Sequence, residues 1–361
     1  MKNKLYIRQF YILAFISVAT FKIGVLPSLL YRQAQSSSLL SMLIMMILEM
    51  FIFLILIEIS SHGSILDVDI PISIKTPLLL LALLSLFIKL NIYLSEGSIF
   101  VKNYVFDEIG LLFVVVPMAI CLFYVSSKGF TSIGKTAEII IWFILVAIFF
   151  DIIFAKIESM DIELDKMSIS TSIVAIDEYI FWFGDFTPFL LITLTKPYGK
   201  NKYKVLFLIG IVLLPTLAML FFIIMYKSAG VDIEYAFAKL AVYNRFSNII
   251  GRFDLLTIIS FLCAMFIKLS LIFVSIIEIL NYFFKRKNIF GIILAIVISC
   301  LTILIFNNLT TTINIATSFI KYIVVSIEFL LPIVVFILQR CYKVSSKTYS
   351  SNLSRMEYDK K

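Results

Sequence analysis

The sequence predicts an all-α integral membrane protein with ten transmembrane helices, arranged as two inverted sets of five. The composition excludes an ordinary soluble domain, because 61% of the 361 residues are hydrophobic and only 15% are charged. Apolar runs of about 18 residues or more recur along the whole chain, and each is long enough to cross a bilayer. Two of these runs are interrupted by glycine within two residues of a charged residue. We therefore expect the lipid bilayer to surround most of the chain.

Apolar run length defines the individual spans. No small-residue cleavage site follows the first span, so we interpret it as a retained helix and not as a signal peptide. The third and eighth spans exceed the length that a bilayer requires, which predicts tilt or projection. The spans form one transmembrane domain over residues 1–342, and the polar tail at 343–361 has a composition typical of disorder. The ten spans are 7–31, 39–60, 77–101, 109–125, 136–155, 173–194, 204–227, 250–283, 289–306 and 317–340.

Lysine and arginine in the loops predict which side of the membrane each loop faces. With both termini on one side, that side carries 19 of these residues and the opposite side carries seven. The loop from Lys156 to Lys166 is acidic and falls on the side with seven. Both termini are therefore predicted to be cytoplasmic, in agreement with an even number of spans.

Ten spans divide into two sets of five, at about 7–155 and 173–340. An odd number of spans in each set gives the halves opposite topology, which is the condition for an inverted repeat. The third span contains Phe87-Ile88-Lys89-Leu90, and its predicted equivalent, the eighth, contains Phe266-Ile267-Lys268-Leu269. The shared lysine supports the repeat.

The first and sixth spans are also predicted equivalents, and both are interrupted near the middle. Each interruption combines glycine with a charge, and proline follows it at Pro27 or Pro188. A charge at bilayer depth normally faces protein or a watery cavity, and a helix break is tolerated only where it lines such a cavity. Broken helices at matching positions indicate a transporter-type binding site. The candidate ligand-binding residues are Lys22, Ile23, Gly24, Lys89, Phe183, Gly184, Asp185 and Lys268.

A broken helix offers two kinds of backbone partner. The half-helix after the break presents free N–H groups that suit a carboxylate, and unwound carbonyls suit an ammonium group or a cation. A zwitterionic amino acid fits this combination. We expect Lys22 to bind a ligand carboxylate directly or to pair with Asp185 when the site is empty. The alternative for each charge is a static buried ion pair that fixes helix packing.

Three further acidic residues lie inside predicted spans. Glu96 follows Lys89 by seven residues and shares its helix face, and we expect it to be a solvated or paired residue near the end of the span. Glu49 and Glu328 need partners that the sequence does not identify.

Other classes of function lack their sequence signals. The four cysteines have no metal-ligand spacing, and the single histidine, His62, lies in a polar loop. The net charge of +8 follows membrane topology, so we expect no nucleic-acid partner. No nucleotide motif, zinc spacing or nucleophile–base pair is present. The sequence therefore predicts a protein that is not an enzyme and has no metal or cofactor.

Short motifs spread over nearly the whole chain match one transporter family. The most specific are an Arg-aromatic-acid opening of the eighth span and a Ser…Leu-Leu-Pro pattern in the tenth. The motifs are Gly24…Pro27 with Ala34-Gln35, Glu49-Met50-Phe51, Gly129…Ile133…Lys135…Glu138, Phe183-Gly184-Asp185, Arg252-Phe253-Asp254 and Tyr322…Ser326…Leu330-Leu331-Pro332. In these motifs the chain resembles the spore germination permeases, the B subunits of GerA-type nutrient germinant receptors, within the amino acid–polyamine–organocation transporter superfamily.

The resemblance implies a LeuT-like fold and a role in nutrient sensing. It implies a membrane subunit that binds an amino-acid-like germinant, triggers germination and assembles with receptor A and C subunits. The membrane would be the spore inner membrane or the cell membrane. A proton-coupled amino acid permease, with Asp185 or a lysine as proton carrier, is the alternative. A structural membrane subunit with a vestigial site is a third reading.

Overall fold

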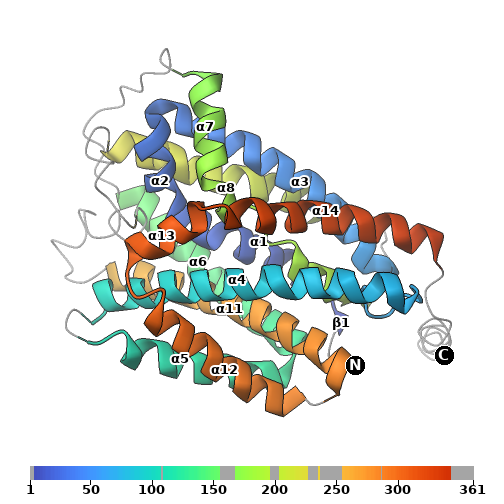
Figure 1. Ribbon diagram of the computed structural model, residues 1–361. Helices are drawn as coiled ribbons and strands as arrows, with labels where there is room; N and C mark the ends of the chain where they lie inside the picture. The colour runs from blue at the N-terminus through green and yellow to red at the C-terminus, as the bar shows by residue number, and fades with distance from the viewer. Residues whose placement is uncertain are drawn as a thin grey trace, which may run out of the picture.

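The computed structural model describes residues 4–106, 109–154, 167–195, 203–226, 235, 254–285 and 287–342. The described chain is almost entirely helical, with long helices packed side by side into one bundle (Figure 1). The predicted tail at 343–361, the acidic loop and Arg252 lie outside the described residues. The helices are α1 (Ile7–Gly24), α2 (Leu26–Ala34), α3 (Ser38–His62), α4 (Ile72–Tyr104), α5 (Leu112–Lys128), α6 (Phe130–Phe154), α7 (Ile169–Tyr179), α8 (Tyr203–Tyr226), α11 (Asp254–Phe284), α12 (Lys287–Leu304), α13 (Leu309–Thr317) and α14 (Ile320–Cys341).

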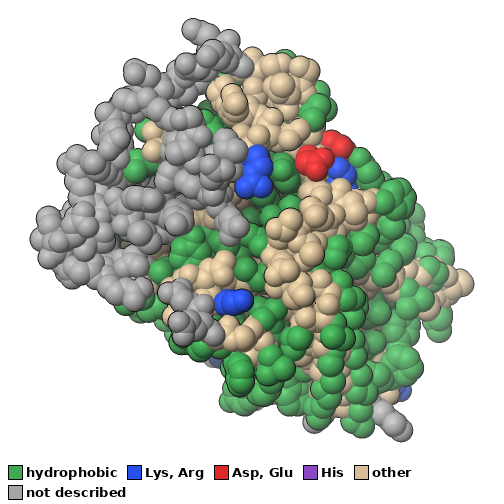
Figure 2. Space-filling model, turned by 60° about the vertical axis from the view of Figure 1, so that its left-hand side comes forward, with side chains coloured by type: hydrophobic (Ala, Val, Ile, Leu, Met, Phe, Trp, Pro, Cys, Tyr) green, Lys and Arg blue, Asp and Glu red, His purple; other side chains and the backbone are tan. Residues whose placement is uncertain are grey.

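Within the described chain, seven helical segments are long and apolar enough to cross a membrane, or eight if the bent pair α12–α13 is one span. Many large apolar side chains point outward, such as Phe113 at 71% exposure and Trp142 at 68%. Hydrophobic side chains cover much of the face shown in Figure 2. Exposed apolar surface on this scale suits lipid and not water. The chain is thus an all-α integral membrane protein.

Two of the ten predicted spans are too short or too irregular to count as continuous membrane helices. The fourth corresponds to α5, which has 17 residues. The sixth corresponds to α7, which has only 11 residues and is followed by short 3₁₀ segments. A straight α-helix needs about 20 residues to cross the hydrocarbon core. The number of ten spans therefore stays a prediction.

The first predicted interruption is a bend and lies slightly later than expected. Lys22–Gly24 remain helical at the end of α1, and the chain bends at Val25 before α2 begins. The Val25 N–H still donates to the Phe21 carbonyl at 3.0 Å. Pro27, in the first turn of α2, has no N–H to continue the helical ladder. The discontinuity predicted at Lys22–Gly24 therefore lies at Val25, directly after these three residues, which remain helical.

The second predicted interruption is open. After α7, residues Ile180–Trp182 form a 3₁₀ turn, η3, and a second 3₁₀ helix, η4, begins at Thr187. Between them Phe183 is extended, Gly184 has φ +105° and Asp185 has φ +64°. Glycine and aspartate are residue types that accept positive φ. The break predicted at Gly184–Asp185 is present.

The interrupted segments lie in the interior of the bundle. Helix α1 is 78% buried, compared with 33% for the apolar windows of α6 and α8. It crosses the middle of Figure 1, with α3 and α14 on one side and α4 and α11 on the other. Strand β1 (Lys4–Leu5) pairs in parallel with β2 (Thr193–Leu194). This pairing connects the start of the first interrupted segment, before α1, to the end of the second, after η4. This arrangement surrounds the break with α3, α4, α11 and α14.

Candidate functional site

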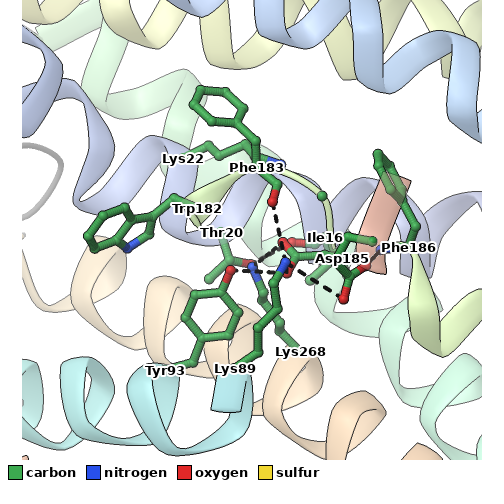
Figure 3. Close-up of polar contacts among 12 residues, drawn as sticks. Ile16, Thr20, Lys22, Lys89, Tyr93, Trp182, Phe183, Asp185, Phe186 and Lys268 are labelled. Carbon is green, nitrogen blue, oxygen red and sulfur yellow. Dashed lines mark hydrogen bonds and ion pairs between the residues drawn. The ribbon is translucent and has the colours of Figure 1, made fainter. Parts of the chain in front are cut away.

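Asp185 is the centre of a buried ionic cluster. Lys89 of α4 donates to its Oδ1 at 2.8 Å, and Lys268 of α11 contacts its Oδ2 at 2.7 Å. The Tyr93 hydroxyl donates to Oδ1 at 3.0 Å. Figure 3 shows the three side chains converging on the carboxylate from the two helices. The two lysines that sequence analysis pairs across the halves therefore bind the same aspartate.

Lys22 has a different partner from the one predicted. Its Nζ lies 2.7 Å from Glu49 of α3, and both side chains are fully buried. The Glu49 carboxylate also accepts a hydrogen bond from the Gly184 N–H at 2.7 Å. The expected Lys22–Asp185 pair is thus absent from this structure. Two other lysines already occupy both oxygens of Asp185, and α3 places a carboxylate directly beside Lys22.

Glu328 of α14 holds the far side of the break. Its Oε2 accepts the N–H groups of Phe186 and Thr187, at 2.6 and 3.0 Å. Its Oε1 accepts the Ser85 hydroxyl at 2.8 Å and lies 3.9 Å from Lys89. Because these N–H groups open η4, a carboxylate is favoured there. The protein's own carboxylates thus occupy the donors where sequence analysis places a ligand carboxylate.

The cluster is balanced in charge and sealed from solvent. It holds three ammonium groups and three carboxylates, each side chain at most 1% exposed. Buried ions are costly unless they are paired and hydrogen-bonded, and here every one is. Aromatic rings add to the enclosure: Lys268 Nζ lies 4.1 Å from the ring centroid of Tyr93 and 4.9 Å from that of Phe21. Such cation–π contacts favour ammonium groups where water is excluded.

Six of the eight predicted site residues take part in this cluster or form its backbone, and two do not. Ile23 lines a small apolar cavity of about 30 Å³ that Phe261 also lines. Gly24 packs so closely against the Phe261 ring that a Cβ there would overlap it. The partners of Glu49 and Glu328 were not predicted from the sequence, and Tyr93 was not among the predicted site residues. The position of Tyr93, four residues after Lys89, was the available signal, because that spacing shares a helix face.

No family model and no curated protein matches this chain. Among the described residues, no group of three or more His, Cys, Asp or Glu side chains is placed to hold a metal ion. The function is therefore inferred from the geometry of the break and from the motifs quoted above.

Proposed function

We propose that this chain is a non-enzymatic membrane subunit that binds a small amino-acid-like molecule and signals its presence, as a spore nutrient germinant receptor subunit does. One observation carries the proposal. At a break in a buried helical segment, three backbone N–H groups are held by carboxylates, and a carboxylate is held by two ammonium groups. A zwitterionic ligand carries the same two groups and can replace the protein's own.

Binding by replacement has a structural consequence. A ligand carboxylate at Gly184 displaces Glu49, and one at Phe186 displaces Glu328. The displaced carboxylate must leave the space that the ligand takes, although Glu49 keeps Lys22 and Glu328 keeps Ser85 as a partner. The helices that carry these residues, α3 and α14, therefore move when the ligand enters. Ligand binding then shifts the population between two conformations, which is how a receptor of this kind signals.

The proposed function includes a specific arrangement of the membrane spans. The first span comprises α1 and α2, and the sixth comprises residues 169–191, in a LeuT-like 5+5 inverted repeat with ten spans. The meeting of Lys89 and Lys268 on one carboxylate supports equivalent positions in two halves. The proposal places both termini in the cytoplasm, the chain in the spore inner membrane or cell membrane, and A and C subunits beside it.

The direct test is ligand-dependent stabilisation of the purified chain in lipid nanodiscs. The common amino acids serve as probes, with thermal unfolding as the measurement. A ligand at a hundredfold excess over its Kd stabilises by about 2.7 kcal/mol. We expect stabilisation by at least one amino acid and its loss in Lys22→Met and Asp185→Asn. Lys321→Met is the matched control, because Lys321 is a buried lysine that pairs with Asp177 outside the cluster. Lack of any stabilisation, or equal loss in the control, contradicts the proposal.

Uptake of labelled amino acid into proteoliposomes separates the two uses of such a site. Stabilisation without uptake is the result that supports a receptor subunit. Uptake that depends on a pH gradient replaces that conclusion with a proton-coupled permease. If neither stabilisation nor uptake is observed, the result supports a structural subunit whose charged cluster only fixes helix packing.

A further inference from the structure

Glu96 is a buried acid that the ionic cluster does not use. From the sequence we expect it to be solvated or paired near the end of its span, but its exposure is 0%. The indole Nε1–H of Trp182 donates to Oε1 at 2.8 Å, whereas Oε2 has no hydrogen-bond partner within the described part of the chain. A nearby phenol, Tyr235, donates to the backbone carbonyl of Glu96 and not to its side chain. The carboxyl group is therefore half satisfied and enclosed.

The charged groups around Glu96 are already paired with each other. From α11, Lys268 is held by Asp185 at 2.7 Å, and Asp185 belongs to the break. On α4 itself, Tyr93 donates to Asp185 and Lys89 also pairs with it. None of the described cations lies within ion-pair distance of the Glu96 carboxyl.

Two further described elements near Glu96, α7 and α13, supply no cation either. From α7, Asp177 and Glu178 face Lys321 of α14. From α13, the Thr312 hydroxyl bonds with that of Ser95, the residue before Glu96. These groups therefore leave the acid without an ionic partner among the described residues.

Two physical arguments favour the neutral acid at this position. An ionised carboxylate with an unpartnered oxygen costs several kcal/mol in a buried site, whereas an unsatisfied hydroxyl costs about 1–3 kcal/mol. The adjoining cluster already balances three ammonium groups with three carboxylates. Ionised Glu96 adds a negative charge that has no ion-pair partner among the described residues, and the protonated acid keeps the interior neutral.

We propose that Glu96 is a proton-binding site: it holds a proton on Oε2 in this closed conformation and releases it to water when the site opens. The step converts the acid to a carboxylate and one proton, and it changes no other group. With Oε1 accepting the Trp182 indole, Oε1 is the carbonyl oxygen and Oε2 is the one that carries the proton. The site is independent of whether the chain senses or transports its ligand.

Infrared spectroscopy of the purified full chain in nanodiscs tests the proposal. We expect a carbonyl stretching band of a protonated carboxylic acid at neutral pH, sensitive to deuterium exchange and lost in Glu96→Gln. Glutamine keeps the oxygen that accepts from Trp182 and has nearly the same shape as the protonated acid. Glu58→Gln is the matched control, because the Glu58 side chain is 45% exposed, and it keeps the band. A band that persists in Glu96→Gln, or no band in the unmodified chain, overturns the proposal.

A second variant decides the question if Glu96→Gln fails to fold. Trp182→Phe leaves Glu96 in place but removes the only described donor to its side chain. The acid band then moves to higher frequency, because a carbonyl that loses a hydrogen bond has a stiffer C=O bond. An unchanged band in Trp182→Phe contradicts the assignment. This readout needs no ligand, so its failure is distinguishable from failure of the amino acid binding experiment.

Discussion

Replacing Asp185 by asparagine removes one carboxylate from beneath two lysines. In the structure Lys268 has this one ion-pair partner among the described residues, at 2.7 Å. Lys89 keeps two weaker contacts, with Glu328 at 3.9 Å and the Phe183 carbonyl at 3.3 Å. Removing one partner of a buried ion pair costs about 3–5 kcal/mol, because the other charge is left uncompensated. We expect Asp185→Asn to lose about that much of the unfolding free energy.

The size of this loss relative to total stability decides what the variant looks like. Domains are typically stable by about 5–15 kcal/mol, so Asp185→Asn remains inserted and folded but unfolds much more easily. Denaturant unfolding in mixed micelles, followed by circular dichroism, measures the difference. Lys321→Met again serves as a control, because its partner Asp177 is 54% exposed and keeps its hydration.

A second substitution tests the electrostatic explanation itself. Adding Lys268→Met to Asp185→Asn leaves two lysines and two carboxylates in the cluster, so the charge balance returns. We expect the double variant to recover much of the lost stability, as coupled neighbours do. Adding Lys89→Met recovers less, because Lys89 retains Glu328 and the Phe183 carbonyl as acceptors. A loss below about 1 kcal/mol in Asp185→Asn, or lysine removal that only adds to the loss, refutes this reasoning.

Two more predictions concern the backbone and the topology. Gly184→Ala is expected to destabilise the protein by about 1–3 kcal/mol, because φ is +105° and a Cβ there lies 3.2 Å from Lys89 Nζ. The control is Gly110→Ala, whose Cβ has no neighbour closer than 3.7 Å. We expect it to have little effect in the same unfolding assay. Single cysteines at Ser159 and Ser350 are expected to react with a membrane-impermeant reagent from opposite sides of sealed vesicles. Labelling of both from one side contradicts the ten-span topology.

The break in the sixth span could be predicted from the sequence because its signals are local. Glycine beside a charge inside an apolar run has few structural solutions in a membrane. The same argument selected Lys89 and Lys268, since each lysine lies well inside a long span and has apolar neighbours. The structure then joined these three residues in one cluster. The pairing of the lysines with Asp185 itself was not predicted.

Partner choice could not be predicted, because it depends on which faces of distant helices meet. Glu49 and Glu328 were visible as isolated charges, but only tertiary packing shows that they reach Gly184 and Phe186. The same limit explains the wrong pairing of Lys22 with Asp185. The first interruption was misplaced for a local reason: Gly24 serves close packing against α11, and the bend follows it at Val25.

The arrangement of the cluster bears on how a ligand and a conformational change are connected. If the N–H groups of the break were free, a ligand carboxylate could bind without disturbing any helix. Here Glu49 of α3 and Glu328 of α14 already hold those groups, and Asp185 is held by α4 and α11. Under the proposed function, a ligand that enters must therefore exchange with side chains from helices on both sides of the break. Because each exchanged side chain must leave the space that the ligand takes, the proposed binding is coupled to helix movement. A sensing subunit and a transporter share this requirement, and the difference between them lies in whether the moved helices also open a path to the opposite side.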